Sequence, residues 1–300
     1  MSEEKHKGER IAKRMARAGL CSRRDAEKWI AAGRVQVNGK AIESAALNVT
    51  QNDKIVVDGK PLAEKEPSQL FLYHKPSGLV TTHKDEKNRK TVFESLPEGL
   101  PRVISVGRLD LNTEGLLLLT NDGELARYLE LPDTGWKRQY RVRVHGKVDE
   151  KRLKNLEKGI KIEGVQYKSI IAKLEPQPEG KEGTSANSWI SITLREGKNR
   201  EIRRVMEALG LKVTRLIRTD YGPFSLGKIS KGAVQEVKVS QMKKNIAGYF
   251  GQKGKGQASK SSKNTYGQKS KNFKKNDKKV NKNVKNKPKS SNFSKKSKKS

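Results

Sequence analysis

A loop between two apolar segments carries the chain's best candidate for a catalytic carboxylate. Residues 103–126 read VISVGRLDLNTEGLLLLTNDGELA, so Asp110 follows one apolar run and precedes another, Leu116–Leu119. Arg108 stands two residues before Asp110, and a nearby arginine favours the ionised carboxylate that a nucleophile requires. The pattern predicts a strand, a loop bearing the carboxylate, a second strand, a turn at 121–123 and a helix.

Two plainer interpretations of this loop compete with catalysis. Asp and Asn often occupy turns only because their side chains hydrogen-bond to nearby backbone groups. A calcium-binding loop would also use Asp110, Asn112 and Glu114 among its first ligands. The twelfth position of such a loop is Asn121 rather than Glu, and the flanking segments resemble strands rather than helices. The sequence therefore argues against calcium and leaves the first alternative open.

Five segments, in order along the chain, resemble motifs of the bacterial ribosomal RNA pseudouridine synthases. They span nearly all of residues 70–239, and the loop that bears Asp110 corresponds to the catalytic motif of that family. The segments are Tyr73–Gly78, Gly107–Leu117, Arg138–Val142, Glu196–Arg204 and Arg215–Gly222.

The resemblance implies an isomerase that converts uridine to pseudouridine without a cofactor or a metal. It implies that Asp110 is the catalytic residue, either as a nucleophile at the ribose or as the base in an elimination. Arg203 would pair with Asp110, and Tyr140 would stack on the target uracil. Arg108 would contact the RNA strand and Leu216 would line the pocket. The target base would have to leave its stack in structured RNA before it could react.

The last of these segments bears on the choice of substrate. Together with Lys231-Gly232 it is most similar to the large-subunit branch of the family, which predicts a uridine of 23S ribosomal RNA as the target. A small-subunit (16S) enzyme is the alternative within the family. A non-catalytic RNA-binding factor in ribosome assembly is an alternative from another class, and the presence of Asp110, Tyr140 and Arg203 argues against it.

The elements that precede these motifs predict a separate small module over residues 9–60. Apolar spacing and turn signals indicate helices over 10–18 and 23–32, with Ser22 as a helix cap, and short strands near 35–37 and 54–57. This order resembles the RNA-binding module of ribosomal small-subunit protein four. Arg23 and Arg24 are predicted to contact phosphate, because they combine full charge with a helix N-terminus.

Residues 61–68 read as a polar linker, and residues 69–249 as an α+β catalytic domain with a mainly antiparallel, mixed sheet. The apolar patterns place strands at 70–73, 103–106, 140–144, 189–194 and 233–239. They place helices at 122–129, 149–158 and 199–209.

The charge of the chain points to a polyanionic partner. The 300 residues carry a net charge of +33, with a pI near 10.1. Eighteen lysines and one aspartate lie in residues 251–300, and the rest of the chain is basic by itself. Residues 250–300 are therefore predicted to be a disordered Lys-rich tail. The expected partner is ribosomal RNA or a ribosomal assembly intermediate, bound by a monomer away from any membrane.

Cysteine and histidine usage excludes several other classes. Cys21 is the single cysteine, so an internal disulfide and a metal site of paired thiolates are excluded. The four histidines are scattered without ligand spacing. The first residues are polar and lack the apolar core of a signal peptide. We therefore expect a cytoplasmic protein.

Overall fold

The computed structural model describes residues 8–131, 134–176 and 187–251. The predicted tail, 250–300, lies outside the described residues except for its first two positions. Within the described ranges, no helix is both long and apolar enough to cross a membrane.

The N-terminal module has the two predicted helices and a small antiparallel sheet. The helices are α1 (Ile11–Arg17) and α2 (Arg23–Ala31). The sheet has the order β3-β2-β5-β6, formed by Lys40–Ala41, Val35–Val37, Ile55–Val57 and Lys60–Pro61, while β1 (Glu9–Arg10) pairs with β4 (Asn48–Val49). Apolar residues at helical spacing on α1 and α2 meet the inward side chains of β2 and β5 in one buried cluster. The predicted helices and strands are confirmed here.

The linker is shorter than predicted. Pro61 belongs to β6, where it pairs with Val56, and the amide of Leu62 still donates to the carbonyl of Ile55 at 2.9 Å. The N-terminal sheet therefore extends into the segment that composition alone assigns to a linker.

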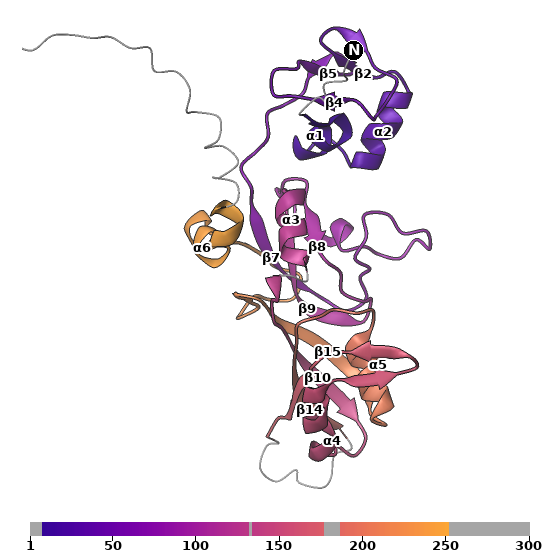
Figure 1. Cartoon of the computed structure of the whole chain (residues 1–300), viewed down its shortest axis with the longest axis vertical. Helices are drawn as coiled ribbons and strands as arrows, with labels where there is room; N and C mark the ends of the chain where they lie inside the picture. Colours follow the sequence, from indigo (N-terminus) through magenta and orange to yellow (C-terminus); the bar gives the residue numbers. More distant parts are fainter. Residues whose placement is uncertain (1–7, 132–133, 177–186, 252–300) are drawn as a thin grey trace, which may run out of the picture. The chain divides into compact units, whose positions relative to one another are not determined.

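The catalytic domain is built on a mixed nine-stranded sheet (Figure 1). Its main path runs β13-β14-β10-β15-β9-β7-β17, with β16 beside β15 and β8 beside β9. Every strand pair is antiparallel except β15 with β9, which confirms the predicted mainly antiparallel, mixed sheet. The strands in chain order are Leu70–Lys75, Ile104–Val106, Thr113–Thr120, Arg138–His145, Ile171–Leu174, Asn187–Leu194, Lys212–Tyr221, Phe224–Ser225 and Val234–Glu236.

Strand β9 is apolar on both sides because both faces of the sheet are covered there. Leu116 and Leu118 point into one buried cluster, with α3 and the C-terminal segment. Leu117 and Leu119 point into another, with Val103 and the loop before it. Side chains alternate between the faces of a strand, so an unbroken leucine run marks a strand that is buried on both faces.

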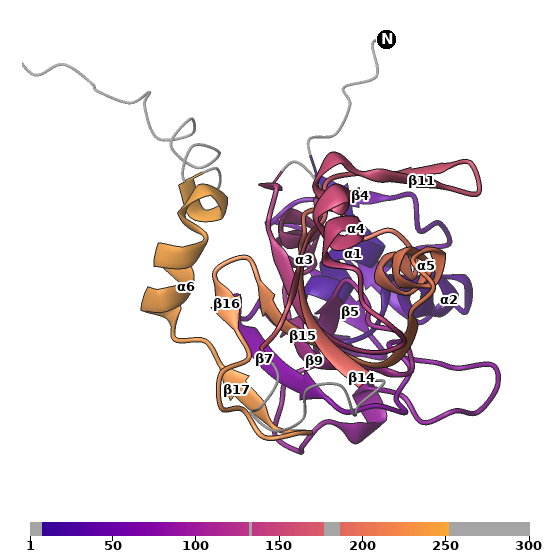
Figure 2. The same ribbon diagram turned by 90° about the horizontal axis from the view of Figure 1, so that it is seen from below.

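Helices cover one face of the part of the sheet formed by β14, β10 and β15 (Figure 2). Helix α4 (Glu150–Asn155), continued by a 3₁₀ turn at Leu156–Lys158, and helix α5 (Glu201–Ala208) bury their apolar sides against β14, β10 and β15 in a single cluster. A hairpin of β11 (Ile160–Ile162) and β12 (Val165–Tyr167) follows α4. Near the other half of the sheet lie α3 (Gly123–Glu130) and a 3₁₀ turn at Phe93–Ser95.

The prediction for residues 233–239 is partly wrong. Strand β17 ends at Glu236, and Val239 begins helix α6 (Val239–Asn245). The pairing of β17 with β7 covers three residues, opposite Phe71–Tyr73, and one more hydrogen bond joins Val237 to Leu70, where β7 begins. The alternating pattern has no partner strand beyond Val237. Met242 and Ile246 of this segment then pack into the core with α3.

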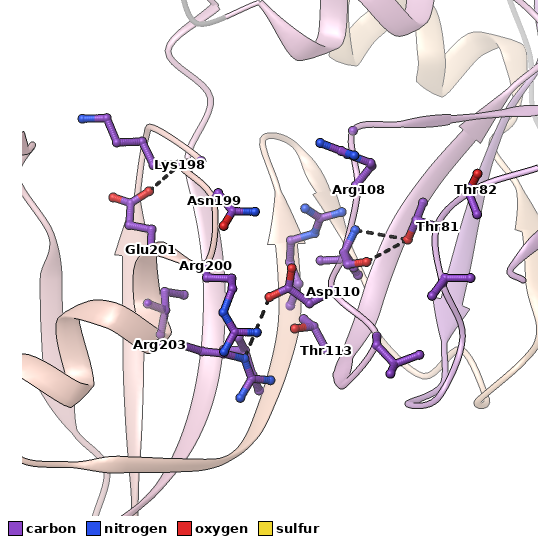
Figure 3. A pocket seen from close by; sticks show the side chains of 18 of the residues that line it. Thr81, Thr82, Arg108, Asp110, Thr113, Lys198, Asn199, Arg200, Glu201 and Arg203 are labelled. Atoms are coloured by element: carbon purple, nitrogen blue, oxygen red, sulfur yellow. Dashed lines mark hydrogen bonds and ion pairs between the residues drawn. The ribbon is translucent and has the colours of Figure 1, made fainter. Parts of the chain in front are cut away.

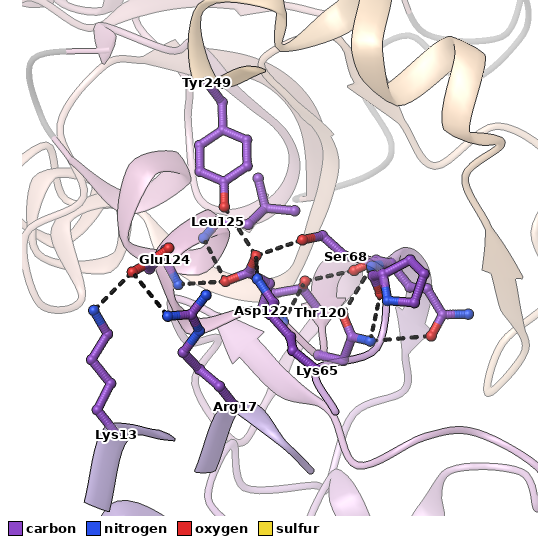
Figure 4. A network of polar contacts seen from close by, with 12 residues as sticks. Lys13, Arg17, Lys65, Ser68, Thr120, Asp122, Glu124, Leu125 and Tyr249 are labelled. Atoms are coloured by element: carbon purple, nitrogen blue, oxygen red, sulfur yellow. Dashed lines mark hydrogen bonds and ion pairs between the residues drawn. The ribbon is translucent and has the colours of Figure 1, made fainter. Parts of the chain in front are cut away.

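A buried carboxylate ties the linker and the C-terminal segment to the start of α3 (Figure 4). Asp122 is the N-cap of α3 and accepts from the amide of Glu124 at 2.9 Å. Its other oxygen accepts from Ser68 at 2.5 Å, Lys65 at 2.9 Å and Tyr249 at 3.0 Å. Burial alone would favour the neutral acid, but the hydrogen bonds from Ser68 and Lys65 outweigh it and hold the pKa of Asp122 far below its usual range.

Candidate active site

The loop that bears Asp110 leaves the sheet at the point where β9 stops pairing with β8 and pairs with β15 instead. Along a single edge of β9, strand β8 pairs with its last residues and β15 pairs with its first residues, Thr113–Gly115. The loop 107–112 connects β8 to β9 and so emerges between β8 and β15. The predicted order of strand, loop, strand, turn and helix is confirmed. The carboxylate thus sits on a short connection between rigid strands.

A buried lysine binds the backbone of this loop. Lys75 is fully buried, and its ammonium group donates to the carbonyls of Asp110 and Leu111, each at 3.2 Å, and of Thr113 at 2.9 Å. Burial lowers the pKa of Lys75 to about 8, against the opposing effect of the Asp110 carboxylate. The group thus fixes three backbone carbonyls of the loop around Asp110.

A threonine from a separate loop fixes the residue before Asp110. The hydroxyl of Thr81 donates to the carbonyl of Leu109 at 2.8 Å and accepts from the amide of Leu109 at 3.3 Å. Both contacts are drawn in Figure 3. Because Leu109 itself is buried, the Asp110 backbone is held on both sides and its side chain is left to face the cleft.

The structure brings Asp110 and Arg203 together, as the resemblance implies. Nε of Arg203 lies 3.9 Å from Oδ2 of Asp110, and its Nη2 donates to the carbonyl of Asn112 at 3.1 Å (Figure 3). The guanidinium therefore contacts the carboxylate and the loop that carries it. Burial lowers the pKa of Arg203, and the Asp110 charge opposes that shift. The Asp110 side chain is 34% exposed, which leaves it open to a substrate.

Tyr140 and Leu216 line the same cleft as Asp110 and Arg203, which has a volume of about 850 Å³. Tyr140 comes from β10 and Leu216 from β15, two neighbouring strands. Arg108 also lines the cleft, but it is exposed and lies apart from the Asp110–Arg203 pair (Figure 3). The cleft thus gathers all five residues that the resemblance selects in the catalytic domain.

The cleft is positively charged overall. Nine basic residues and five acidic residues line it, which suits a polyanion rather than a neutral metabolite. The basic residues are Lys84, Lys87, Arg89, Arg108, Arg138, Lys198, Arg200, Arg203 and Arg218.

Helix α5 begins at a strained turn on the wall of the cleft. Arg200, its N-cap, has a left-handed φ of 52° and no capping side chain, which is why α5 begins at Glu201 rather than at the predicted Asn199. Glu201 is buried and accepts from the amide of Lys198 at 2.9 Å. Burial raises the pKa of Glu201 to about 7, so this carboxyl titrates near neutral pH.

Three residues at the site escape sequence reasoning: Lys75, which binds the Asp110 loop, and Glu201 and Arg218, which line the cleft. All three are charged side chains that the fold buries, while composition alone places charged residues at the surface. Each lies inside a segment that the family resemblance covers, so the resemblance was the available signal, although it assigned them no role.

In the N-terminal module, Arg23 and Arg24 are exposed at the start of α2. The helix end is already capped, because the hydroxyl of Ser22 accepts from the amide of Asp25 and the Asp25 carboxylate accepts from the amide of Ser22. A phosphate at this end would compete with Asp25. The two arginine charges are available to RNA, but the helix terminus itself is occupied.

Two of the residues that favour a large-subunit substrate have a structural partner. Arg215 and Lys231 both bind the buried carboxylate of Glu114, at 2.7 Å and 2.8 Å. The hydrogen bond from Arg215, reinforced by Lys231, lowers the pKa of Glu114 to about 2. These residues join β15 and the loop between β16 and β17 to β9, so they support the fold more directly than they indicate the choice of RNA.

Comparison with known proteins identifies the family that the motifs around the cleft resemble. Residues 69–208 match the family described as RNA pseudouridylate synthase, and residues 9–55 match the S4 domain. An uncharacterized RNA pseudouridine synthase of Rickettsia felis is 51% identical over 229 residues, which is 76% of this chain and 96% of that protein. Ribosomal large subunit pseudouridine synthase B of Pasteurella multocida is 42% identical over 244 residues, 78% of this chain and 68% of that protein.

A solved structure is similar as well. The crystal structure of a pseudouridylate synthase covers 79% of this chain and 100% of its own, with 28% identity and a TM-score of 0.55. Family matches, relatives and the cleft around Asp110 agree, and the chain therefore belongs to the RNA pseudouridine synthases, enzymes that isomerise uridine in RNA to pseudouridine.

Proposed function

We infer that the substrate is a uridine of large-subunit (23S) ribosomal RNA, modified during ribosome biogenesis. The relatives from Pasteurella multocida and Yersinia pestis, at 42% and 43% identity, are both ribosomal large subunit pseudouridine synthase B. A basic cleft and an S4 domain with exposed arginines supply the charge that such an RNA requires. The protein acts in the cytoplasm as a monomer, on the RNA or on an assembly intermediate.

The observation that carries the catalytic assignment is the pairing of Asp110 with Arg203 in the cleft, at 3.9 Å. Asp110 attacks the ribose or serves as the base in an elimination, and Arg203 is its positively charged partner and orients it. The flipped uracil stacks on Tyr140 against the apolar side chain of Leu216. Arg108, at the exposed side of the cleft, contacts the RNA strand that the base has left.

Arg23 and Arg24 contribute affinity rather than chemistry. They lie on the N-terminal module, exposed and without a role in its core. Phosphate contacts from such residues fix the register of an RNA and carry no sequence information of their own. The choice of uridine then depends on the fold of the RNA that both domains engage.

The test is incubation of the purified protein with large-subunit and small-subunit ribosomal RNA, followed by mapping of pseudouridine in each. The expected result is modification at a single position of the large-subunit RNA. Modification of small-subunit RNA alone would assign the protein to the other branch. Absence of new pseudouridine in RNA and in assembly particles alike would support the non-catalytic assembly factor.

A further inference from the structure

One arginine of the cleft is buried without a partner for all of its donors. Arg218, on β15, is 3% exposed and lines the cleft. Its Nε donates to the carbonyl of Leu116 at 2.7 Å. Its Nη2 is buried and finds no hydrogen-bond acceptor among the described residues. A buried charged donor in this state is costly unless a ligand completes it.

The sheet holds this guanidinium in a fixed place. The carbon of the guanidinium lies 5.1 Å from the centre of the Tyr221 ring, over which it packs. Gly115, the residue of β9 opposite Arg218, has φ +101°, and a Cβ there would lie 2.2 Å from the Arg218 carbonyl oxygen. Only glycine lets the two strands approach this closely. The unpartnered donor is therefore rigid before any substrate arrives.

Strand register places Arg218 beside the proposed position of the uracil. Arg218 pairs directly with Tyr140 across β15 and β10, and Leu216 lies two residues earlier on the same face. Directly paired residues of antiparallel strands point to the same side of the sheet, as do residues two apart. The orphaned donor thus shares a face with the residues that hold the base.

Two kinds of acceptor would suit Nη2: a phosphate oxygen and a uracil carbonyl. Phosphates lie on the strand outside the extruded base, where exposed Lys87 and Arg200 are available. Arg218 is more enclosed than either and pairs with Tyr140, so it lies nearer the proposed position of the base than of the phosphates. These observations favour the carbonyl.

We propose that Arg218 is a catalytic residue that donates from Nη2 to a carbonyl oxygen of the uracil and stabilises the uracil as a leaving group. When the bond from N1 to C1′ breaks, its electron pair stays on the base and spreads from N1 to O2 and O4. C1′ is meanwhile bonded to the Asp110 carboxylate, or is part of a glycal if Asp110 has taken the C2′ proton. C5 then forms a bond to C1′ as the bond to Asp110 breaks, or as C2′ regains its proton; the proton on C5 is released, and N1 takes up a proton. Arg218 keeps its own protons throughout, because a guanidinium does not deprotonate in proteins. This role rests on the placement of the uracil at Tyr140 proposed above.

The test compares two leaving groups under single-turnover conditions. One RNA substrate carries uridine at the target and the other carries 5-fluorouridine, whose fluorine stabilises the uracil anion, and cleavage of the N1–C1′ bond is measured for both. With uridine, Arg218→Met should lower the rate constant about 100- to 1,000-fold, as loss of one donor to a developing anion does. With 5-fluorouridine the loss should be much smaller. RNA affinity should change little.

A matched control is Arg141→Met, an exposed arginine on β10 that pairs with Glu175 and should leave both rates unchanged. Equal losses for both bases would assign Arg218 a structural role and overturn the proposal. So would a loss of affinity with an unchanged rate constant, which would mark a phosphate contact.

If Arg218→Met does not fold, Arg218→Lys supplies the same comparison, because it keeps the charge and loses the second donor. It should lose less than the methionine variant and show the same dependence on the leaving group, and equal losses for both bases would again overturn the proposal. Wild-type protein that fails to convert uridine would contradict the proposed function instead, so the two failures are distinguishable.

Discussion

At the scale of single residues, two cations position Asp110. Lys75 donates to the backbone carbonyls of the Asp110 loop, while Arg203 contacts both the Asp110 carboxylate and the carbonyl of Asn112. Neither contact depends on substrate. Asp110 is consequently presented in one orientation, and the free enzyme is already arranged for reaction.

Replacement of Arg203 tests this division. Arg203→Ala should lower the single-turnover rate on the order of 100-fold or more, because the carboxylate loses its charge partner and its loop loses a tether. Arg203→Lys should recover part of the rate, since an ammonium group supplies charge but cannot reach Asp110 and Asn112 with a planar fork. Arg204→Ala, an exposed neighbour on α5, is the control. A wild-type rate for Arg203→Ala would leave Arg108 as the candidate partner of Asp110.

At the scale of elements, the apolar pattern predicted most helices and strands, whereas the burial of charged residues could not be predicted. The leucine run of β9, the capped helix α2 and the alternating strand β10 follow from their sequences. Helix α6 was missed because an alternating run continues past the end of the partner strand β7. Burial of Lys75 and Arg218 could not be predicted, since it arises from strands that meet only in the folded sheet.

The carboxyl of Glu201 at the start of α5 should make stability depend on pH. The pKa of Glu201 in the folded protein, about 7, lies above the ordinary value of 4.5. The contribution of this carboxyl to the free energy of unfolding is therefore fully present below pH 4.5 and is lost as the pH rises through 7. The wild type should lose stability on the order of 1–3 kcal/mol across this range relative to Glu201→Gln. Urea unfolding at several pH values measures the difference.

The exposed Glu207 of the same helix supplies the control, Glu207→Gln, which should follow the wild type at every pH. A difference between wild type and Glu201→Gln that does not change with pH would show that the Glu201 carboxyl titrates normally in the folded protein.

At the scale of the whole molecule, two basic domains serve one reaction centre. The S4 domain provides exposed arginines, and the second domain provides a basic cleft in which Asp110 pairs with Arg203. The order of the motifs was sufficient to predict the family and five residues that line the cleft. The branch of the family was harder, because Arg215 and Lys231, which favoured a large-subunit substrate, are occupied by Glu114.

The central claim is that the Asp110 carboxylate reacts at the ribose and that no pseudouridine forms without it. Its most direct test is the single-turnover rate of pseudouridine formation by Asp110→Asn at saturating enzyme, with RNA affinity measured in parallel and Asp220→Asn as the control. The amide keeps the shape of the side chain and removes the charge and nucleophilicity. We expect no detectable pseudouridine and nearly unchanged affinity. Conversion at a rate comparable to the wild type would contradict the account.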